Sequence, residues 1–215
     1  MCRRRRSKVS PVEILLATGN PKKIAELRGM LEPLGFEALA PDDVGGLPTV
    51  IEDEPTFAGN ARKKAISAAR ATEKWALADD SGLEVDHLGG APGVGSARFA
   101  GSHGDDDANN EKLLALLAGI PAEQRGARFV CALALAAPDG EIAFETEGTA
   151  RGRILEGPRG DGDFGYDPLF LFTEAGHAAT GRGFAELTAE EKRAVSHRGR
   201  ALRELAGSLP ELMRS

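Results

Sequence analysis

Two adjacent carboxylates, Asp79 and Asp80, close a short apolar run and are followed by Ser81 and Gly82. Adjacent residues of a β-strand point to opposite faces, so these two side chains are expected to do different work. One can bind a hard cation such as Mg²⁺, while the other sits beside it as a second ligand or a general base. Glu52, in an acidic loop earlier in the chain, could complete the set of oxygen ligands. A hairpin turn explains the same residue types, because Asp, Ser and Gly all favour turns.

The segment Thr18-Gly19-Asn20-Pro21-Lys22-Lys23 lies where an apolar strand is expected to meet a helix. A helix N-terminus exposes unpaired N–H groups and the positive end of the helix dipole, and both favour phosphate. Thr18 and Asn20 add hydrogen-bond donors, and Lys23 adds a positive charge. An ordinary strand-to-helix turn with a surface lysine accounts for this segment equally well.

The stretch from Gly160 to Pro168 contains the pattern G-x-G-x-x-G. It is not a dinucleotide-binding loop, because it follows another loop and Pro168 blocks the helix that should come next. Phe164 and Tyr166, cradled by glycines, could instead stack on a planar base. The alternative is an aromatic pair that covers an edge of the core.

A cluster of polar residues near the C-terminus comprises Lys192, Ser196, His197 and Arg198. On one continuous helix Lys192 and Ser196 share a face, but His197 and Arg198 point elsewhere. A break near Ser196, with Ser196 capping a new helix, would let the other three side chains reach one cleft. The same residues also fit a solvated helix face.

The elements that must position these segments alternate between strand and helix. Hydrophobic patterns and turn residues predict strands at 13–17, 36–40, 75–79, 83–86, 128–137, 141–150 and 169–172. They predict helices at 21–34, 56–74 and 111–117, and a C-terminal helix that opens at a capping box formed by Thr188 and Glu191. The sequence Pro138-Asp139-Gly140 predicts a hairpin. This order indicates an α/β protein with a mixed sheet rather than a purely parallel one.

Composition limits the class of protein. The chain has 215 residues, and its 27 Lys and Arg against 33 Asp and Glu give a net charge of −6. Five of the basic residues lie within the first eight, which leaves a net charge of −11 for the rest. We therefore expect a disordered basic arm at 1–10, a single domain at 11–210, and no binding of nucleic acid by the acidic body. The apolar runs are too short to span a membrane, and two scattered cysteines suit a cytoplasmic protein.

Taken together and in this order, the segments resemble the inosine triphosphate pyrophosphatase family. The matching stretches are LLATGNPKKIAELRGML, TFAGNARKKAISAA, ALADDSGLEVDHLGGAPGVGSARFAG, GDGDFGYDPLF and AELTAEEKRAVSHRGRAL, from about residue 14 to about residue 205. The resemblance implies an elongated mixed sheet with flanking helices, in two lobes around a central cleft, and a homodimer. It also implies Mg²⁺-dependent hydrolysis of non-standard purine nucleoside triphosphates (ITP, dITP and XTP) to the monophosphate and pyrophosphate.

The resemblance also implies roles for individual residues. Phosphates would be held by Thr18, Gly19, Asn20, Pro21, Lys22 and Lys23, with Lys23 the key cation. Asp80 would be the general base, Ser81 would touch the substrate, and Glu52 with Asp79 or Asp80 would hold Mg²⁺. The nucleoside pocket would be formed by Phe164, Gly165, Tyr166 and Asp167, and the base edge would be read by Lys192, His197 and Arg198.

Base selectivity can also be argued from the residues. Hypoxanthine and xanthine present O6, a hydrogen-bond acceptor, where adenine presents an amino donor. A pocket lined by donors such as Arg198 and His197 would therefore favour the non-standard bases. Two other functions fit the same pocket: a nucleotide sensor without hydrolysis, and a related pyrophosphatase that acts on modified pyrimidine nucleotides. The carboxylate pair disfavours the sensor, because a pure binder gains nothing from carboxylates beside a triphosphate unless metal is present.

Overall fold

The computed structural model describes residues 12–162 and 164–212. The basic arm expected at 1–10 lies outside these residues. Among the residues described, no helix is long and apolar enough to cross a membrane.

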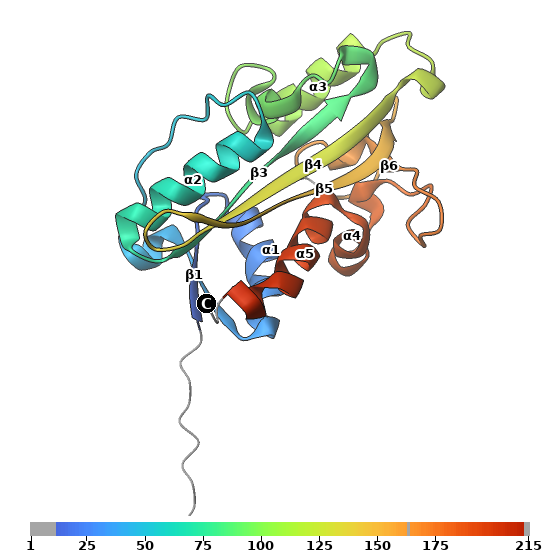
Figure 1. Cartoon of the computed structure of the whole chain (residues 1–215). Helices are drawn as coiled ribbons and strands as arrows, with labels where there is room; N and C mark the ends of the chain where they lie inside the picture. The colour runs from blue at the N-terminus through green and yellow to red at the C-terminus, as the bar shows by residue number, and fades with distance from the viewer. Residues whose placement is uncertain (1–11, 163, 213–215) are drawn as a thin grey trace, which may run out of the picture.

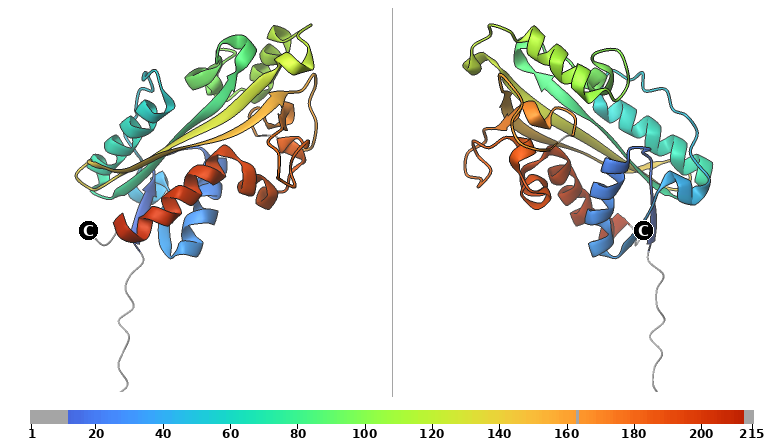
Figure 2. Two further views of the ribbon diagram at one scale, coloured as in Figure 1. Left: turned by 45° about the vertical axis from the view of Figure 1, so that its right-hand side comes forward. Right: turned by 180° about the vertical axis from the view of Figure 1, so that it is seen from behind.

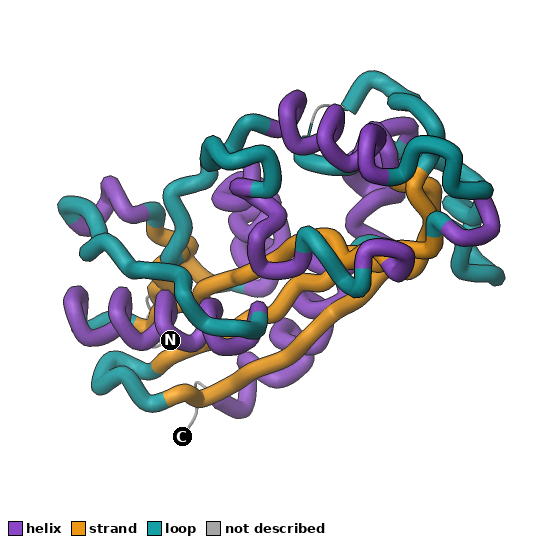
Figure 3. Tube along the Cα trace, turned by 90° about the horizontal axis from the view of Figure 1, so that it is seen from above, coloured by secondary structure: helices purple, strands orange, loops and turns teal. Residues whose placement is uncertain are grey.

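One six-stranded sheet runs the length of the molecule (Figures 1 and 3). Its strands are β1 (Val12–Leu16), β2 (Phe36–Leu39), β3 (Trp75–Val85), β4 (Gly126–Ala136), β5 (Ile142–Ile154) and β6 (Phe170–Phe172), in the spatial order β2-β1-β3-β4-β5-β6. Strand β1 runs parallel to β2 and β3, whereas the pairs β3–β4, β4–β5 and β5–β6 are antiparallel. The prediction of a mixed sheet with a long antiparallel hairpin is confirmed.

Helices cover both faces of this sheet (Figure 2). They are α1 (Pro21–Leu31), α2 (Phe57–Thr72), α3 (Asp106–Leu116), α4 (Ala189–Val195) and α5 (His197–Leu212). Helix α2 packs on one face, and α1 and α5 pack on the other (Figures 1 and 2). The α1–α5 face is built mainly from leucines, and each fully buried leucine contributes about 1.5–3 kcal/mol.

Small side chains line the contact between α2 and the sheet. On the helix they are Ala61, Ala65, Ala68 and Ala69, and on β3 and β4 they are Ala76, Ala78, Ala132, Ala134 and Ala136. These residues are buried, and with alanine on both sides the helix can approach the sheet closely. The alanines of α2 therefore form the face by which the helix packs on the sheet.

The turn considered at Asp80-Ser81-Gly82 does not exist. Strand β3 runs without interruption through these residues and pairs with β4 from Ala76 to Val85. Gly82 serves close packing instead: a Cβ at this position would collide with the Ser96 side chain and lie 2.7 Å from the carbonyl oxygen of Gly93. Only glycine leaves enough room here, because the segment Gly93–Arg98 packs directly against the strand.

Candidate active site

The turn between β1 and α1 is stabilised by its own side chains. The Asn20 Oδ1 atom accepts hydrogen bonds from the backbone N–H groups of Lys22, at 2.9 Å, and Lys23, at 3.3 Å. Thr18 Oγ1 accepts from the backbone N–H of Asn20 at 3.2 Å. Asn20 is thus the N-cap of α1, and the N–H groups of Lys22 and Lys23, two of those expected to face a phosphate, are already bonded within the turn. The Lys23 side chain carries the positive charge of this turn toward β3.

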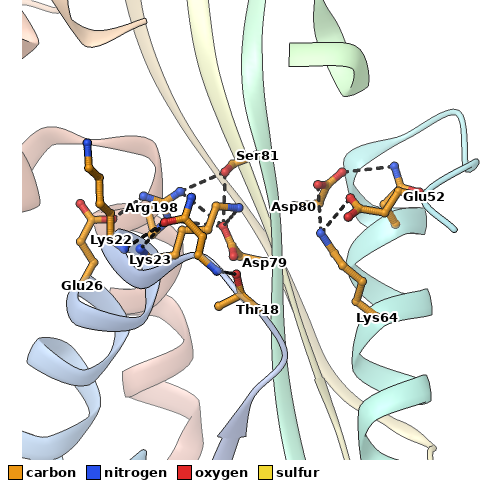
Figure 4. Close-up of polar contacts among 12 residues, drawn as sticks. Thr18, Lys22, Lys23, Glu26, Glu52, Lys64, Asp79, Asp80, Ser81 and Arg198 are labelled. Atoms are coloured by element: carbon orange, nitrogen blue, oxygen red, sulfur yellow. Dashed lines mark hydrogen bonds and ion pairs between the residues drawn. The ribbon is translucent and has the colours of Figure 1, made fainter. Parts of the chain in front are cut away.

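Asp79 connects this turn to the start of α5 (Figure 4). Its Oδ2 atom lies 2.8 Å from Lys23 Nζ and 3.4 Å from two guanidinium nitrogens of Arg198. Arg198 also donates to Ser81 Oγ at 3.0 Å and pairs with Glu26. Burial alone would raise the pKa of Asp79, but the charges of Lys23 and Arg198 outweigh it and hold this pKa well below its usual range. Asp79 therefore stays ionised inside the protein.

Asp80 points to the opposite face of β3, toward α2 (Figure 4). Its Oδ1 atom accepts from Lys64 Nζ at 3.1 Å, and its Oδ2 atom accepts from Asn60 Nδ2 at 3.2 Å. The same Lys64 Nζ atom donates to Glu52 Oε2 at 3.0 Å. Burial raises the pKa of Asp80, and the neighbouring Glu52 carboxylate adds to the rise against the opposing charge of Lys64. A carboxylate with a raised pKa is a stronger base than an ordinary one.

The pairing of Glu52 with Asp80 suits a divalent cation. Oxygens of both carboxylates converge on a single cationic atom, Lys64 Nζ, so the two side chains already share one positive charge. No group of three or more His, Cys, Asp or Glu side chains that could hold a metal occurs among the residues the structure describes. Two carboxylates fit Mg²⁺ in particular, because this ion keeps several waters and takes substrate phosphates as further ligands. Asp79 does not join this pair, since it faces the other side of the strand.

The loop that carries Phe164 is fixed from several sides. Asp106 Oδ2 accepts from the Gly165 N–H and Asn110 Nδ2 donates to the Gly165 carbonyl, both at 2.9 Å. Tyr166 is buried, and its hydroxyl donates to the backbone carbonyl of Ser96 at 2.9 Å. These bonds, all made with helix α3 and the segment before it, hold the loop so that the Phe164 ring lies near Lys22 of the turn between β1 and α1.

Three cations surround the Phe164 ring. The ammonium nitrogens of Lys192 and Lys22 lie 5.1 Å and 5.7 Å from its centre, and the Arg198 guanidinium carbon lies 5.7 Å from it. Lys192 also forms an ion pair with the buried Asp167. Burial raises the pKa of Asp167 despite the attraction of Lys192. Hydrogen-bond donors therefore lie around the place where a planar base would meet Phe164.

The break predicted near Ser196 is present and places His197 and Arg198. Ser196 is extended, it ends α4, and its Oγ atom accepts from the Gly199 N–H at 3.1 Å. His197 stacks on Phe129, with ring centres 4.8 Å apart, and its Nδ1 atom is buried without a partner. Burial lowers the pKa of His197 well below its ordinary value, and nearby Arg198 acts in the same direction. The imidazole is therefore neutral at pH 7.

A single cavity of about 950 Å³ collects these groups. It is lined by the predicted phosphate, carboxylate and base-binding residues Thr18, Gly19, Asn20, Pro21, Lys22, Lys23, Glu52, Asp80, Ser81, Phe164, Gly165, Tyr166, Asp167, His197 and Arg198. Such a volume suits a small molecule of nucleotide size. Lys23, Asp80 and Phe164 share this hollow, as the predicted site requires.

Comparison with known proteins decides the family. The model of the Ham1 family matches residues 14–208. The chain belongs to the Ham1 family. It is 48% identical to a dITP/XTP pyrophosphatase from Rhodopirellula baltica over 202 residues, which cover 94% of this chain and 93% of that protein.

Two solved structures extend the comparison. A Ham1 protein from Coxiella burnetii superposes with a TM-score of 0.82 at 38% identity, covering 93% of this chain and 99% of the other. A nucleoside-triphosphatase / dITP/XTP pyrophosphatase from Mycobacterium abscessus has a TM-score of 0.72 at 49% identity, covering 90% and 98%. The family and the fold predicted from the sequence are confirmed.

Two predicted residues of this Ham1-family site do not line the cavity. Asp79 is not a lining residue, but it pairs with Lys23 and Arg198, which are. Lys192 is not a lining residue either; its ammonium lies over Phe164 and pairs with Asp167. Both therefore touch residues that do line the cavity.

Sequence reasoning missed Asn60 and Lys64, which hold the Asp80 carboxylate. They are spaced i, i+4 on α2 and so share the helix face that meets β3. This i, i+4 spacing of two polar residues beside the alanine face was the sequence pattern that could have indicated their role. It also missed Glu26, which lies one turn after Lys22 on α1 and pairs with Arg198.

Proposed function

We propose that this Ham1-family protein hydrolyses non-standard purine nucleoside triphosphates, namely ITP, dITP and XTP, to the monophosphate and pyrophosphate. The single observation that carries the proposal is that Lys23, the Glu52–Asp80 pair and Phe164 line one cavity. A cation for phosphates, a pair of metal-binding carboxylates and a ring for a base are the groups that such a reaction needs. The names of the relatives, dITP/XTP pyrophosphatases, support the same activity.

Asp80 is the proposed general base, which takes a proton from the water that attacks the α-phosphorus. Its raised pKa favours this task, and its hydrogen bond from Asn60 fixes the direction of the carboxylate. Glu52 and Asp80 would hold Mg²⁺, which when bound neutralises phosphate charge and orients the leaving pyrophosphate.

Lys23 is the proposed cation for the phosphates. The buried Asp79 carboxylate holds its ammonium at 2.8 Å, which keeps a charged group fixed beside the cavity. A cation that is already oriented loses little conformational freedom when the triphosphate arrives, so it stabilises the bound phosphates effectively. Arg198 pairs with the same carboxylate and lies over Phe164, the ring on which the base is proposed to stack.

The nature of the products tests the proposal. We incubate the protein with dITP and Mg²⁺ and follow the products by phosphorus NMR. Formation of dIMP and pyrophosphate supports the proposal, and formation of dIDP and orthophosphate contradicts it. A parallel sample with excess EDTA is expected to show no turnover. The homodimer implied by the family is a separate prediction, which sedimentation of the same sample checks.

A further inference from the structure

The Lys64 side chain occupies the place between the two carboxylates proposed for the metal (Figure 4). Its Nζ atom lies 3.0 Å from Glu52 Oε2 and 3.1 Å from Asp80 Oδ1, and the side chain is only 14% exposed. Both contacts are charge-assisted hydrogen bonds at normal length. Without a metal, therefore, the carboxylate pair already has a cation from the chain itself.

The surroundings keep Lys64 in this place. It projects from the middle of α2, whose alanine face is fixed against β3 and β4. Asn60, one turn earlier, donates to the other oxygen of Asp80 and accepts from the backbone N–H of Glu54, so the Asp80 carboxylate is held from both sides. A divalent cation and this ammonium need the same Glu52 and Asp80 oxygens, and two cations at one such place repel each other.

We propose that Lys64 competes with the metal for Glu52 and Asp80, so that the divalent cation enters the site together with the triphosphate and not before it. The inference rests on the proposed function, because it takes these two carboxylates as the metal pair. A triphosphate supplies what the protein alone lacks: anionic oxygens that can accept the Lys64 ammonium and further oxygen ligands for the cation. Lys64 is thus a positioning residue that makes metal binding depend on nucleotide.

Metal binding to the nucleotide-free protein tests the proposal. We titrate the protein with Mn²⁺ and measure free Mn²⁺ by electron paramagnetic resonance. Lys64→Met removes the competing charge, so Mn²⁺ is expected to bind about tenfold or more tightly than to the wild type. Lys64→Arg keeps the charge and should bind Mn²⁺ as weakly as the wild type does. Equal or weaker Mn²⁺ binding by Lys64→Met overturns the proposal.

A matched control lies next to Lys64 on the same helix. Lys63 pairs with the exposed Asp53, so Lys63→Met removes an equal charge close to the site without touching the carboxylate pair. This variant is expected to bind Mn²⁺ like the wild type. If it gains as much affinity as Lys64→Met, the effect comes from the overall charge of the region and the proposal fails.

A measurement on the unmodified protein covers the case in which Lys64→Met does not fold. The Nζ resonance of Lys64 in ¹⁵N-labelled protein is expected to shift when Mg²⁺ is added with the α,β-methylene analogue of dITP, and to stay in place with Mg²⁺ alone. A shift with Mg²⁺ alone overturns the proposal. Absence of any metal binding even with the analogue contradicts the proposed function itself, so the two failures are distinguishable.

Discussion

Asp79 and Lys23 form an ion pair 2.8 Å long between carboxylate and ammonium, and the Asp79 side chain is completely buried. The same carboxylate binds Arg198 at the start of α5. One buried negative charge on β3 therefore fixes two cations that come from distant parts of the sequence. Lys23 lies in the turn between β1 and α1, and Arg198 lies at the start of α5 near Phe164. The relative position of these two cations depends on Asp79.

Replacing this carboxylate should harm both stability and substrate binding. Asp79→Asn leaves Lys23 and Arg198 without their shared negative partner, and breaking a buried pair in this way costs about 3–5 kcal/mol. We expect the free energy of unfolding to fall by that amount in urea titrations and KM for dITP to rise more than kcat falls.

The control for Asp79→Asn is Asp53→Asn, which removes a carboxylate paired with the exposed Lys63. Exposed pairs contribute about 0–1 kcal/mol, so this variant should stay close to the wild type. If both variants lose the same stability, or if Asp79→Asn leaves KM unchanged, Asp79 does not organise the site.

The cations around Phe164 should determine the choice of base. Lys192 and Arg198 carry hydrogen-bond donors over the Phe164 ring, and donors match the O6 acceptor of hypoxanthine but oppose the amino group of adenine. A buried mismatch costs about 1–3 kcal/mol, so kcat/KM for dITP should exceed that for dATP by about 5- to 150-fold. Lys192→Met removes one of these donors and should lower the ratio of kcat/KM for dITP to kcat/KM for dATP.

Lys112→Met is the matched control for base selectivity, because Lys112 lies over the ring of Phe99 and neither residue lines the cavity. It is expected to leave the ratio of dITP to dATP unchanged. Equal kcat/KM values for dATP and dITP in the wild type would show that hydrogen-bond donors near Phe164 do not select the base.

The neutral state of His197 makes stability depend on pH. Burial, with Arg198 acting in the same direction, lowers the pKa of His197 well below its ordinary value, so below about pH 6.5 the unfolded chain binds a proton that the folded protein does not. The contribution of His197 to stability should therefore be fully present above about pH 6.5 and should be lost by up to about 1.4 kcal/mol per pH unit as the pH decreases below it.

His197→Phe, which keeps an aromatic ring beside Phe129, isolates this contribution. Urea unfolding of both proteins at pH 7 and pH 5 gives two differences in stability, and the wild type should lose more than the variant. The remaining histidines are common to both proteins and cancel. Equal losses in the two proteins would show that His197 does not titrate differently on folding.

Several features of the site follow from local sequence rules. Asp79 and Asp80 face opposite sides because strand residues alternate, and α5 starts anew after Ser196 because its hydroxyl caps the next turn. The alanine face of α2 also follows from its 3.6-residue period. These features depend only on residues near one another in the chain.

Other features depend on contacts between distant segments. From the sequence alone, Gly82 is typical of a turn. In the structure it is part of a continuous strand, and glycine is needed there because Ser96 and Gly93 pack against it. Lys64 pairs with Glu52 and Asp80 across 12 and 16 residues, and no local pattern specifies that pairing. The N-cap role of Asn20 depends on the rotamer of its side chain, which the sequence does not specify.

Asp80→Asn tests the proposed roles of Asp80 as general base and metal ligand. The amide keeps the size of the side chain and can still bond Asn60 or Lys64, but it cannot take a proton from water. We expect turnover of dITP to fall by about 10²- to 10⁴-fold while the α,β-methylene analogue still binds, as measured by calorimetry. Full turnover by this variant would remove Asp80 from the mechanism.

The position of attack by water tests the central claim most directly. Hydrolysis of dITP by the wild type in H₂¹⁸O should place the label in the phosphate of dIMP and leave pyrophosphate unlabelled, as read by mass spectrometry of the separated products. Label in pyrophosphate would mean that water attacks the β-phosphorus. Label in orthophosphate, formed with dIDP, would place the reaction at the terminal phosphate. Either result contradicts a site in which Asp80 directs water to the α-phosphorus.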